Sequence, residues 1–339
     1  MSFEQQVIYC FSQLSEYIYE DKNHLEESIK KACLNNPWFT AVECKSMLNQ
    51  IANTYCNKDI LSQWLKQYSP IKPKSKNVGL IAAGNIPLVA FHDILCIIAS
   101  GYTCQLKLSE KDQVLYHWLH ESLKLIDLEI AQKISIVEKL SNYDAVIATG
   151  SSSSSNLFQS YFKHVPHIIR SHRNAIAVLD GSEDEIDFVN IGKDIFQYYG
   201  LGCRNVSKIY VPFGYNFSNL IRTLDINFEH VNDHTKYKNN YDYNFALCIM
   251  NRPNFYQGNT LLLVENKSIA SPIGILNFEY YTDLNDLCEK LAKNEIHIQC
   301  ISAKKNLPNL NTVNFGNCQN PSLEDYADGI NTMDFLLNL

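Results

Sequence analysis

Cys203 has neighbours that suit a reactive thiol. It is one of eleven cysteines, and it stands between Gly202 and an Arg-Asn pair in the stretch YYGLGCRNVSKIYVP. A catalytic cysteine reacts as the thiolate, and a free thiol with a pKa of about 8.5 is mostly protonated at neutral pH unless a cation or amide dipoles stabilise its anion. Arg204 and the backbone amides after Gly202 could lower the pKa in this way, and a glycine lets a substrate approach the backbone closely. The alternative is a buried structural cysteine, which is the interpretation that most of the other cysteines require.

Three further stretches place polar residues where a predicted strand ends. In AAGNIPLVAFHD, Asn85 follows a strand as a neutral amide donor, although the sequence alone favours a turn or capping role. In LKLSEKD, Lys107 follows another strand and Glu110 comes three residues later, which alone describes a solvated surface. In ATGSSSSSN, Gly150 precedes a predicted helix, so that free amides there could hold a phosphate, with a capped flexible turn as an equal alternative. Ligands of open α/β sheets bind outside the carboxyl ends of the strands, so these loops are candidate sites.

The chain that positions these residues is 339 residues long, which suits two domains. Apolar residues recur at spacings of three and four near the N-terminus, which predicts helices there. These residues are Phe3, Val7, Phe11, Leu14 and Ile18. The stretch SPIKPKSK (69–76) ends that pattern, and strand-like and helix-like segments alternate from residue 77 onward. Examples are the helix-like QVLYHWLHESLKLI and the strand-like AVIAT and VSKIYVP, the last of which follows Cys203. This alternation predicts an α/β fold with a doubly wound parallel sheet, and a second α/β region after Cys203.

The composition excludes several classes of protein. Hydrophobic residues make up 46% of the chain and charged residues 19%, as in ordinary globular proteins. The net charge of −7 argues against a nucleic-acid-binding protein, which would carry a basic surface. No segment reaches the roughly 18 uninterrupted apolar residues of a membrane span. The odd number of cysteines and the lack of a Cys-x-x-Cys pair argue against a disulfide framework and a zinc ribbon. The N-terminus lacks the features of a secretory signal, so a cytoplasmic protein is expected.

The four stretches, in this order and at these spacings, resemble the aldehyde dehydrogenase superfamily. Within it they are most similar to the fatty acyl-CoA reductases of the LuxC type, which make aldehyde for bacterial luminescence. The motifs that carry the resemblance are GNIPLVAFHD, LKLSEKD, RNAIAVLDG and GCRNVSKIYVP, and the similarity runs from about residue 77 to the C-terminus. It implies a Rossmann-type cofactor domain and an α/β catalytic domain. We therefore expect an N-terminal helical segment (1–76), a nucleotide-binding domain (77–190), a catalytic domain (191–318) and a C-terminal segment (319–339).

The resemblance also implies a role for each candidate residue. Cys203 would accept the acyl group, and Asn85 would form an oxyanion hole with the Cys203 amide. The nucleotide would be held by Lys107, Ser109, Glu110, Gly150 and Ser151. NADPH is the expected reductant. NADH is the alternative, because Glu110 stands where NAD-preferring relatives often place an acid, and an acid there would repel a 2′-phosphate.

Two positions depart from the superfamily pattern. Aldehyde-oxidising members carry a glutamate that brings water onto the thioester, some 34 residues before the cysteine, and counting back from Cys203 gives Ile169. Without such a base the thioester should persist until it is reduced or exchanged with a thiol. The second departure is the glutamate that usually holds the nicotinamide ribose, whose place is taken by Ser268 in SIASP.

The resulting hypothesis is reduction of a fatty acyl-CoA, or of a related thioester such as an acyl-carrier protein, to the aldehyde through an acyl-Cys203 intermediate. The reaction requires no metal. One alternative is an aldehyde dehydrogenase that works in the oxidative direction. Another is a non-catalytic relative that binds acyl groups or nucleotide. The only partner expected besides the acyl substrate is a second copy of the chain, by analogy with the superfamily.

Overall fold

The computed structural model describes residues 1–150, 152–171 and 173–339, which form two compact units. Unit 1 comprises Met1–His172 together with Ser322–Leu339, and unit 2 comprises Arg173–Pro321. The C-terminal residues therefore return to the N-terminal unit. Each unit has its own sheet and its own core.

Unit 1 is built on a five-stranded parallel sheet in the order β3-β2-β1-β4-β5. The strands are β1 (Asn77–Ile81), β2 (Thr103–Lys107), β3 (Ile134–Ile136), β4 (Ala145–Thr149) and β5 (His167–Arg170). In the central strand β1, Ile81 lies between Lys107 of β2 and Ala148 of β4. The strand order reverses between β1 and β4, and doubly wound sheets bind their ligands at the carboxyl edge of this switch point.

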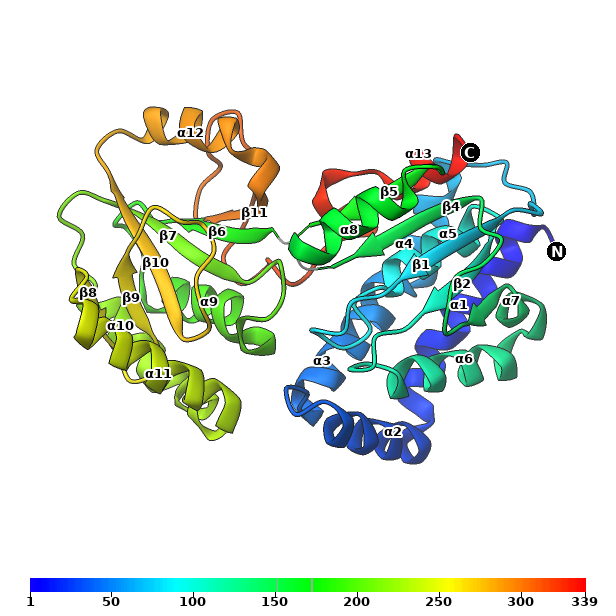
Figure 1. Cartoon of the computed structure of the whole chain (residues 1–339), viewed down its shortest axis with the longest axis horizontal. Helices are drawn as coiled ribbons and strands as arrows, with labels where there is room; N and C mark the ends of the chain where they lie inside the picture. The colour runs from blue at the N-terminus through cyan, green and yellow to red at the C-terminus, as the bar shows by residue number, and fades with distance from the viewer. Residues whose placement is uncertain (151, 172) are drawn as a thin grey trace. The chain divides into compact units, whose positions relative to one another are not determined.

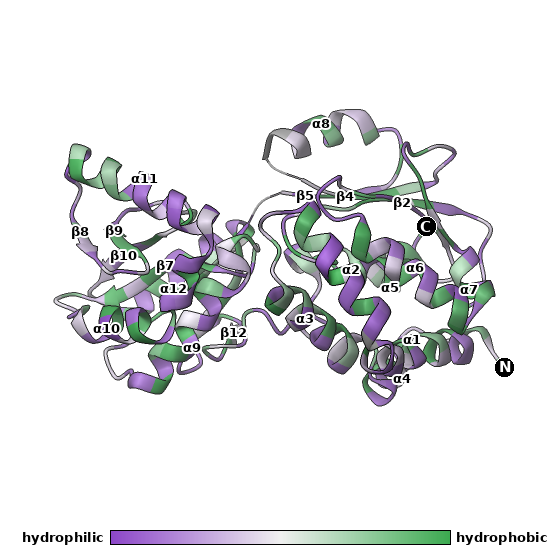
Figure 2. Cartoon of the chain, turned by 90° about the horizontal axis from the view of Figure 1, so that it is seen from below, coloured by the Kyte–Doolittle hydropathy of each residue, from purple (hydrophilic) through white to green (hydrophobic). Residues whose placement is uncertain are grey.

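Helices cover both faces of this sheet. Figure 2 shows α8 on one face and α5 and α6 on the other. The helices of unit 1 are α1 (Phe3–Glu20), α2 (Lys22–Asn35), α3 (Ala41–Gln50), the π-helix η1 (Ile51–Tyr55), α4 (Lys58–Lys66), α5 (Phe91–Ala99), α6 (Val114–Ile126), α7 (Leu128–Gln132), α8 (Ser152–Phe162), the 3-10 helix η5 (Ala327–Gly329) and α13 (Thr332–Leu337).

The N-terminal helices belong to the body of unit 1. Helix α1 buries Val7, Phe11, Leu14 and Ile18, which confirms the helix predicted from their spacing. Helix α1 lies against α6, and α2 also packs on α6. The segment that we expected as a separate region therefore shares its core with the first sheet. The four-part division drawn from the sequence is finer than these two units, and it stays a prediction.

Unit 2 contains a seven-stranded sheet in the order β12-β11-β6-β7-β10-β9-β8, in which β8 runs antiparallel to β9. The strands are β6 (Asn174–Val178), β7 (Val206–Pro212), β8 (Phe255–Gln257), β9 (Leu262–Glu265), β10 (Ile275–Tyr281), β11 (Ile298–Ala303) and β12 (Thr312–Val313). Strand β6, which the sequence-based division placed in the nucleotide-binding domain, pairs with β7 and β11 in this sheet.

The helices of unit 2 flank its sheet. Figure 1 shows α12 on one side and α9 on the other. The helices are α9 (Glu185–Phe196), η2 (Gln197–Gly200), α10 (Ser218–Asn227), η3 (Glu229–Asp233), α11 (Thr235–Asn251), α12 (Leu284–Lys293) and η4 (Glu295–His297). Leu287 and Leu291 of α12 pack on Ile176 and Tyr210 of the sheet. Among the described residues of the chain, no helix has the length and apolar character needed to cross a membrane.

Candidate active site

The Asn85 turn, residues 82–90, connects β1 to α5 at the carboxyl edge of the first sheet. Asn85 itself is half-buried. Pro87 is a residue type that suits the first turn of a helix, but α5 begins at Phe91. The reason is Leu88, whose φ of 48° lies in the left-handed region and interrupts the helical path.

Two side chains from other elements hold the Asn85 turn. The Leu88 amide donates to Oδ2 of Asp112 at 2.7 Å, and Nδ2 of Asn36 donates to the Gly84 carbonyl at 3.3 Å. A Cβ atom at Gly84 would lie 2.6 Å from Oγ of Ser109, so only glycine fits here. The turn is therefore packed directly against the loop that carries the expected nucleotide residues.

That second loop, the Lys107 loop (residues 107–113), follows β2. Ser109 accepts a hydrogen bond from the Lys111 amide at 3.3 Å. Glu110 is exposed, and its carbonyl accepts a hydrogen bond from Nδ2 of Asn35 at 2.9 Å. The structure thus brings together Asn85, Lys107, Ser109 and Glu110 on adjoining loops.

A pocket of about 310 Å³ opens beside Lys107. Its lining residues are Ile81, Lys107, Lys139, Leu140, Leu157, Phe158, Tyr161 and Phe162. The walls are mainly apolar and aromatic, with two lysines, which suits a flat ring system attached to a polar or anionic group. The wall from α8 was not predicted from the sequence, although Leu157, Phe158 and Tyr161 recur at helical spacing.

Gly150 follows β4 at the carboxyl edge of the first sheet, beside Phe158 of the pocket wall. A Cβ atom there would lie 2.8 Å from Cβ of Ser154 and 3.0 Å from the ring of Phe158. A glycine is therefore required where β4 leads toward α8. Ser151, the other expected nucleotide residue of this turn, lies outside the described residues.

The Cys203 turn, residues 201–205, lies in unit 2 and leads into β7. The cysteine therefore precedes its strand, whereas the three loops of unit 1 follow theirs. Cys203 is half-buried. Asn205, only 2% exposed, holds the turn: its Oδ1 accepts from the Gly202 amide at 2.8 Å, and its Nδ2 donates to three carbonyls at the end of α9 and the start of η2. These carbonyls belong to Asp194, Ile195 and Gln197, at 3.1, 3.2 and 2.8 Å.

The chain reaches this turn through unusual backbone geometry. Tyr198, Tyr199 and Gly200 have φ values of 52°, 55° and 77°. Two successive non-glycine residues in the left-handed region are costly and persist only where surrounding contacts fix them. The ring of Tyr199 packs on His234 with centroids 4.1 Å apart. Neither this strained approach nor the role of Asn205 was predicted from the sequence.

The Cys203 turn is also tied to the segment that follows β12. Nη1 of Arg204 donates to the Cys318 carbonyl at 3.5 Å. The Asp194 carboxylate accepts from the amides of Gly316 and Cys318 at 2.8 and 3.0 Å. Burial raises the pKa of Asp194, although these amides oppose the rise. The end of α9 is thus fixed both to the turn and to residues 316–318.

Comparison with known proteins decides the family. The family described as acyl-CoA reductase (LuxC) matches residues 8–218, more than half of the chain and a range that includes Asn85 and Cys203. The chain belongs to the LuxC acyl-CoA reductase family. It is therefore an oxidoreductase of acyl or aldehyde substrates, as the motifs predicted. No curated protein matches the chain in sequence.

Solved aldehyde dehydrogenases share the fold. Aldehyde dehydrogenase 21 from Physcomitrella patens, in complex with the reaction product succinate, has a TM-score of 0.67 at 12% identity, over 98% of this chain and 84% of that one. An NAD-dependent aldehyde dehydrogenase from Sinorhizobium meliloti gives 0.65 at 15%, over 89% and 70%. The Mycobacterium tuberculosis aldehyde dehydrogenase complexed with NAD⁺ gives 0.65 at 13%, over 88% and 73%. These similarities confirm the predicted aldehyde dehydrogenase-like α/β fold.

In this LuxC-family chain, Ile169 has apolar surroundings. It lies on β5 beside Ala148 and packs against a cluster that includes Leu140 and Phe162. The next residue, Arg170, is buried and paired with the Asp93 carboxylate, with Nη2 2.8 Å from Oδ1. Position 169 is thus half-buried against an apolar cluster of unit 1.

The loop that carries Ser268 in the LuxC-family chain is held by buried side chains of neighbouring strands. Nζ of Lys208 donates to the Lys267 carbonyl at 2.8 Å and pairs with Glu279 at 2.6 Å. Nδ2 of Asn277 donates to the Ser268 carbonyl at 3.1 Å. The Ser268 hydroxyl donates to the Ala270 carbonyl at 2.9 Å, so its hydrogen is used within its own loop.

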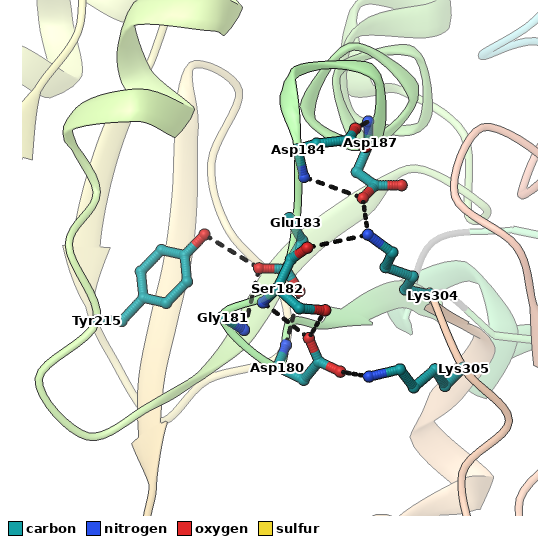
Figure 3. Close-up of polar contacts among 9 residues, drawn as sticks. All are labelled: Asp180, Gly181, Ser182, Glu183, Asp184, Asp187, Tyr215, Lys304 and Lys305. Atoms are coloured by element: carbon teal, nitrogen blue, oxygen red, sulfur yellow. Dashed lines mark hydrogen bonds and ion pairs between the residues drawn. The ribbon is translucent and has the colours of Figure 1, made fainter.

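The motif RNAIAVLDG ends in a turn whose acidic side chains form ion pairs with lysines (Figure 3). Asp180 pairs with Lys305 and Asp187 with Lys304, both at 2.7 Å. Burial opposes ionisation of Asp180, but hydrogen bonds from Lys305 and Ser182 outweigh it and lower the pKa of Asp180 to about 2. These contacts give the turn a structural role. Within the described residues, no three His, Cys, Asp or Glu side chains are grouped to hold a metal ion.

Proposed function

We propose that the chain reduces a fatty acyl-CoA, or a related acyl thioester, to the aldehyde through an acyl-Cys203 thioester, with NADPH as the reductant. The observation that carries this proposal is the apolar surroundings of Ile169. An oxidising relative needs a base for water at this offset from the cysteine, and a hydrocarbon side chain cannot act as one. The acyl-cysteine would then survive until it is reduced.

In the first step, the Cys203 thiolate attacks the acyl carbonyl. A new carbon–sulfur bond forms, the bond to the sulfur of coenzyme A breaks, and coenzyme A leaves as a thiolate that takes a proton from solvent. We assign to the Asn85 amide and the Cys203 backbone amide the stabilisation of the negative charge that develops on the carbonyl oxygen. Asn205 fixes the turn that carries the nucleophile, because its side chain accepts a hydrogen bond from the Gly202 amide and donates one to the Gln197 carbonyl.

In the second step, the acyl-cysteine gains a hydride equivalent and collapses to free aldehyde and the Cys203 thiolate. A bound nicotinamide cofactor would supply that hydride. The residues of unit 1 fit such a group, because the pocket beside Lys107 offers apolar walls to an adenine ring and a cation to its ribose or phosphate. Gly150 leaves space for the side chains of Ser154 and Phe158 of α8, a helix whose N-terminal amides would attract phosphate.

The choice between NADPH and NADH depends on Glu110. Its side chain is exposed on the Lys107 loop, where a carboxylate would repel a 2′-phosphate and accept hydrogen bonds from a 2′-hydroxyl. NADPH remains our assignment from the resemblance, and NADH is the alternative that this residue favours. A cytoplasmic location, a carrier-protein substrate and a homo-oligomeric state stay predictions.

The test is a reaction of the wild-type protein with a long-chain acyl-CoA in the absence of any reductant. We expect an acyl group on the peptide that contains GLGCR, found by mass spectrometry and released by hydroxylamine, with little free fatty acid. Addition of NADPH or NADH should then convert the bound acyl group to aldehyde. Rapid catalytic release of fatty acid without cofactor would instead show that another base activates water, and it would overturn the reductive assignment.

A further inference from the structure

Asp112 is a buried carboxylate that the proposed chemistry does not use. It lies near the end of the Lys107 loop and is 1% exposed. Its Oδ2 accepts the hydrogen bond from the Leu88 amide, and its buried Oδ1 has no partner among the described residues. Burial raises the pKa of Asp112 to about 7, although the Leu88 amide opposes the rise. Burial of an acid costs free energy. The hydrogen bond to Leu88 should offset part of this cost by stabilising the backbone of the turn.

Leu88 has a backbone conformation that needs such stabilisation. Its side chain is 1% exposed, and its φ of 48° is one that a branched residue rarely adopts. Its carbonyl accepts a hydrogen bond from the Phe91 amide at 2.9 Å, at the point where α5 begins. Without Asp112 the Leu88 amide would be a buried donor with no acceptor. The carboxylate therefore stabilises a backbone conformation that the residue type disfavours.

A second side chain holds the other end of the same turn. Asn36, 4% exposed, donates from Nδ2 to the Gly84 carbonyl, and its Oδ1 accepts from the Trp38 amide at 3.0 Å. Its neighbour Asn35 holds the Lys107 loop through the Glu110 carbonyl. The end of α2 thus contacts both loops.

We propose that Asp112 and Asn36 are positioning residues that hold the Asn85 turn in the orientation its amide needs to stabilise the oxyanion. Gly84 and Leu88 flank Asn85, and each has one backbone group bound by a side chain from another element. Any rotation of the turn breaks at least one of these bonds. The proposal rests on the proposed function for the role of Asn85.

The kinetic test compares Asp112→Ala with Asp112→Asn. The alanine variant removes the acceptor, and we expect kcat for acyl-CoA reduction to fall by about 10²-fold with little change in KM, because a small displacement of a catalytic group has an effect of this size. The asparagine variant keeps an oxygen for the Leu88 amide and should retain most of the activity. Leu123→Ala, at the far end of α6, is the matched control: it removes a buried side chain without touching the turn and should leave kcat unchanged.

Hydrogen exchange provides a test that does not depend on activity. We expect faster exchange of the amides in residues 84–90 in Asp112→Ala and in Asn36→Ala, and wild-type rates in Asp112→Asn and Leu123→Ala. Asn36→Ala also gives the comparison if Asp112→Ala does not fold. Unchanged exchange in both variants, or an equal loss of kcat in Leu123→Ala, would overturn the proposal. If the wild type forms no acyl-enzyme, the proposed function fails, and the exchange pattern still decides whether these two residues hold the turn.

Discussion

The Asn85 turn and the Cys203 turn carry the two residues proposed for acyl chemistry, and they are held in different ways. The Cys203 turn is held mainly by Asn205, which bonds Gly202 within the turn and carbonyls 8 to 11 residues upstream. The Asn85 turn is held by Asp112 and Asn36, which are 24 residues from Leu88 and 48 residues from Gly84. The Cys203 turn is thus supported mostly by local contacts, with one long-range hydrogen bond from Arg204 to the Cys318 carbonyl, whereas the Asn85 turn is supported by the tertiary fold of unit 1.

This difference has a consequence for stability and for function. A turn with local support keeps its shape as long as the adjoining helix and strand are formed. The Asn85 turn also requires that α2 and the start of α6 are packed in place, because Asn36 and Asp112 lie beside those elements. Disturbing the packing of α2 or of the start of α6 should therefore affect Asn85 before it affects Cys203.

The largest effect should come from removing the nucleophile. Cys203→Ala is expected to abolish both acyl-enzyme formation and aldehyde production, because no other step can start without the thiolate. The matched control is Cys300→Ala, another half-buried cysteine of unit 2, which should keep its activity. Aldehyde is measured by chromatography of the products. Its formation by the Cys203→Ala variant would contradict the assignment of Cys203 as the nucleophile.

The next effect concerns the other turn. Asn85→Ala should lower kcat by about 10²–10³-fold, the usual loss for one oxyanion donor. Asn57→Ala removes an asparagine that caps α4 in the same unit, and it should reduce thermal stability without reducing kcat. Single-turnover acylation rates measured for both variants make the comparison. A wild-type rate in Asn85→Ala would reduce Asn85 to a turn residue.

A smaller effect is expected in the Lys107 loop beside the Asn85 turn. Glu110→Gln should raise the ratio of kcat/KM for NADPH to that for NADH, and a tenfold change corresponds to about 1.4 kcal/mol. The backbone should stay in place, since Asn35 binds the carbonyl of residue 110 and not its side chain. Glu121→Gln on α6, which removes an exposed acid paired with Lys124, is the control. If both variants leave the ratio unchanged, the Glu110 carboxylate faces solvent.

Much of the fold could be predicted from the sequence because its elements have clear local patterns. The apolar runs AVIAT and VSKIYVP are strands β4 and β7 with the same bounds, and the helix predicted from QVLYHWLHESLKLI differs from α6 by one residue. The position of Cys203 before a strand was visible for the same reason. Each pattern depends on neighbouring residues alone.

The parts that sequence analysis missed depend on distant partners. Strand β5 has only four residues, with His167 and Arg170 at its ends. Arg170 can be buried there because Asp93 and Thr332, 77 and 162 residues away, bind its guanidinium. Asp112 appeared to be one more charge of a solvated loop, and its burial depends on the Asn85 turn packing over it. No local pattern carries this information.

The smallest predicted effect uses the pH dependence of stability to compare two acids in opposite settings. Asp112 is buried and its pKa is raised to about 7, whereas hydrogen bonds lower the pKa of Asp180 in the acidic turn of Figure 3 to about 2. An unfolded aspartate has a pKa of about 3.9. Between pH 4 and 7, therefore, Asp112 holds its proton in the folded state and has lost it in the unfolded state.

Since the folded state then binds more protons, the free energy of unfolding of the wild type falls as the pH rises through this window, by at most about 1.4 kcal/mol per pH unit. Asp112→Asn cannot titrate, so its melting temperature relative to the wild type should increase from pH 5 to pH 7 and level off above pH 8. Asp180→Asn is the control: the lowered pKa of Asp180 gives a stabilisation that is complete above pH 5 and is lost only in acid, so the difference from wild type should stay constant over the same range. Melting curves by circular dichroism at pH 5, 6, 7 and 8 measure both. A difference for Asp112→Asn that does not vary with pH would show that the Asp112 carboxylate is ionised throughout, with water or another donor at Oδ1, and that the tertiary support of the Asn85 turn carries a full charge.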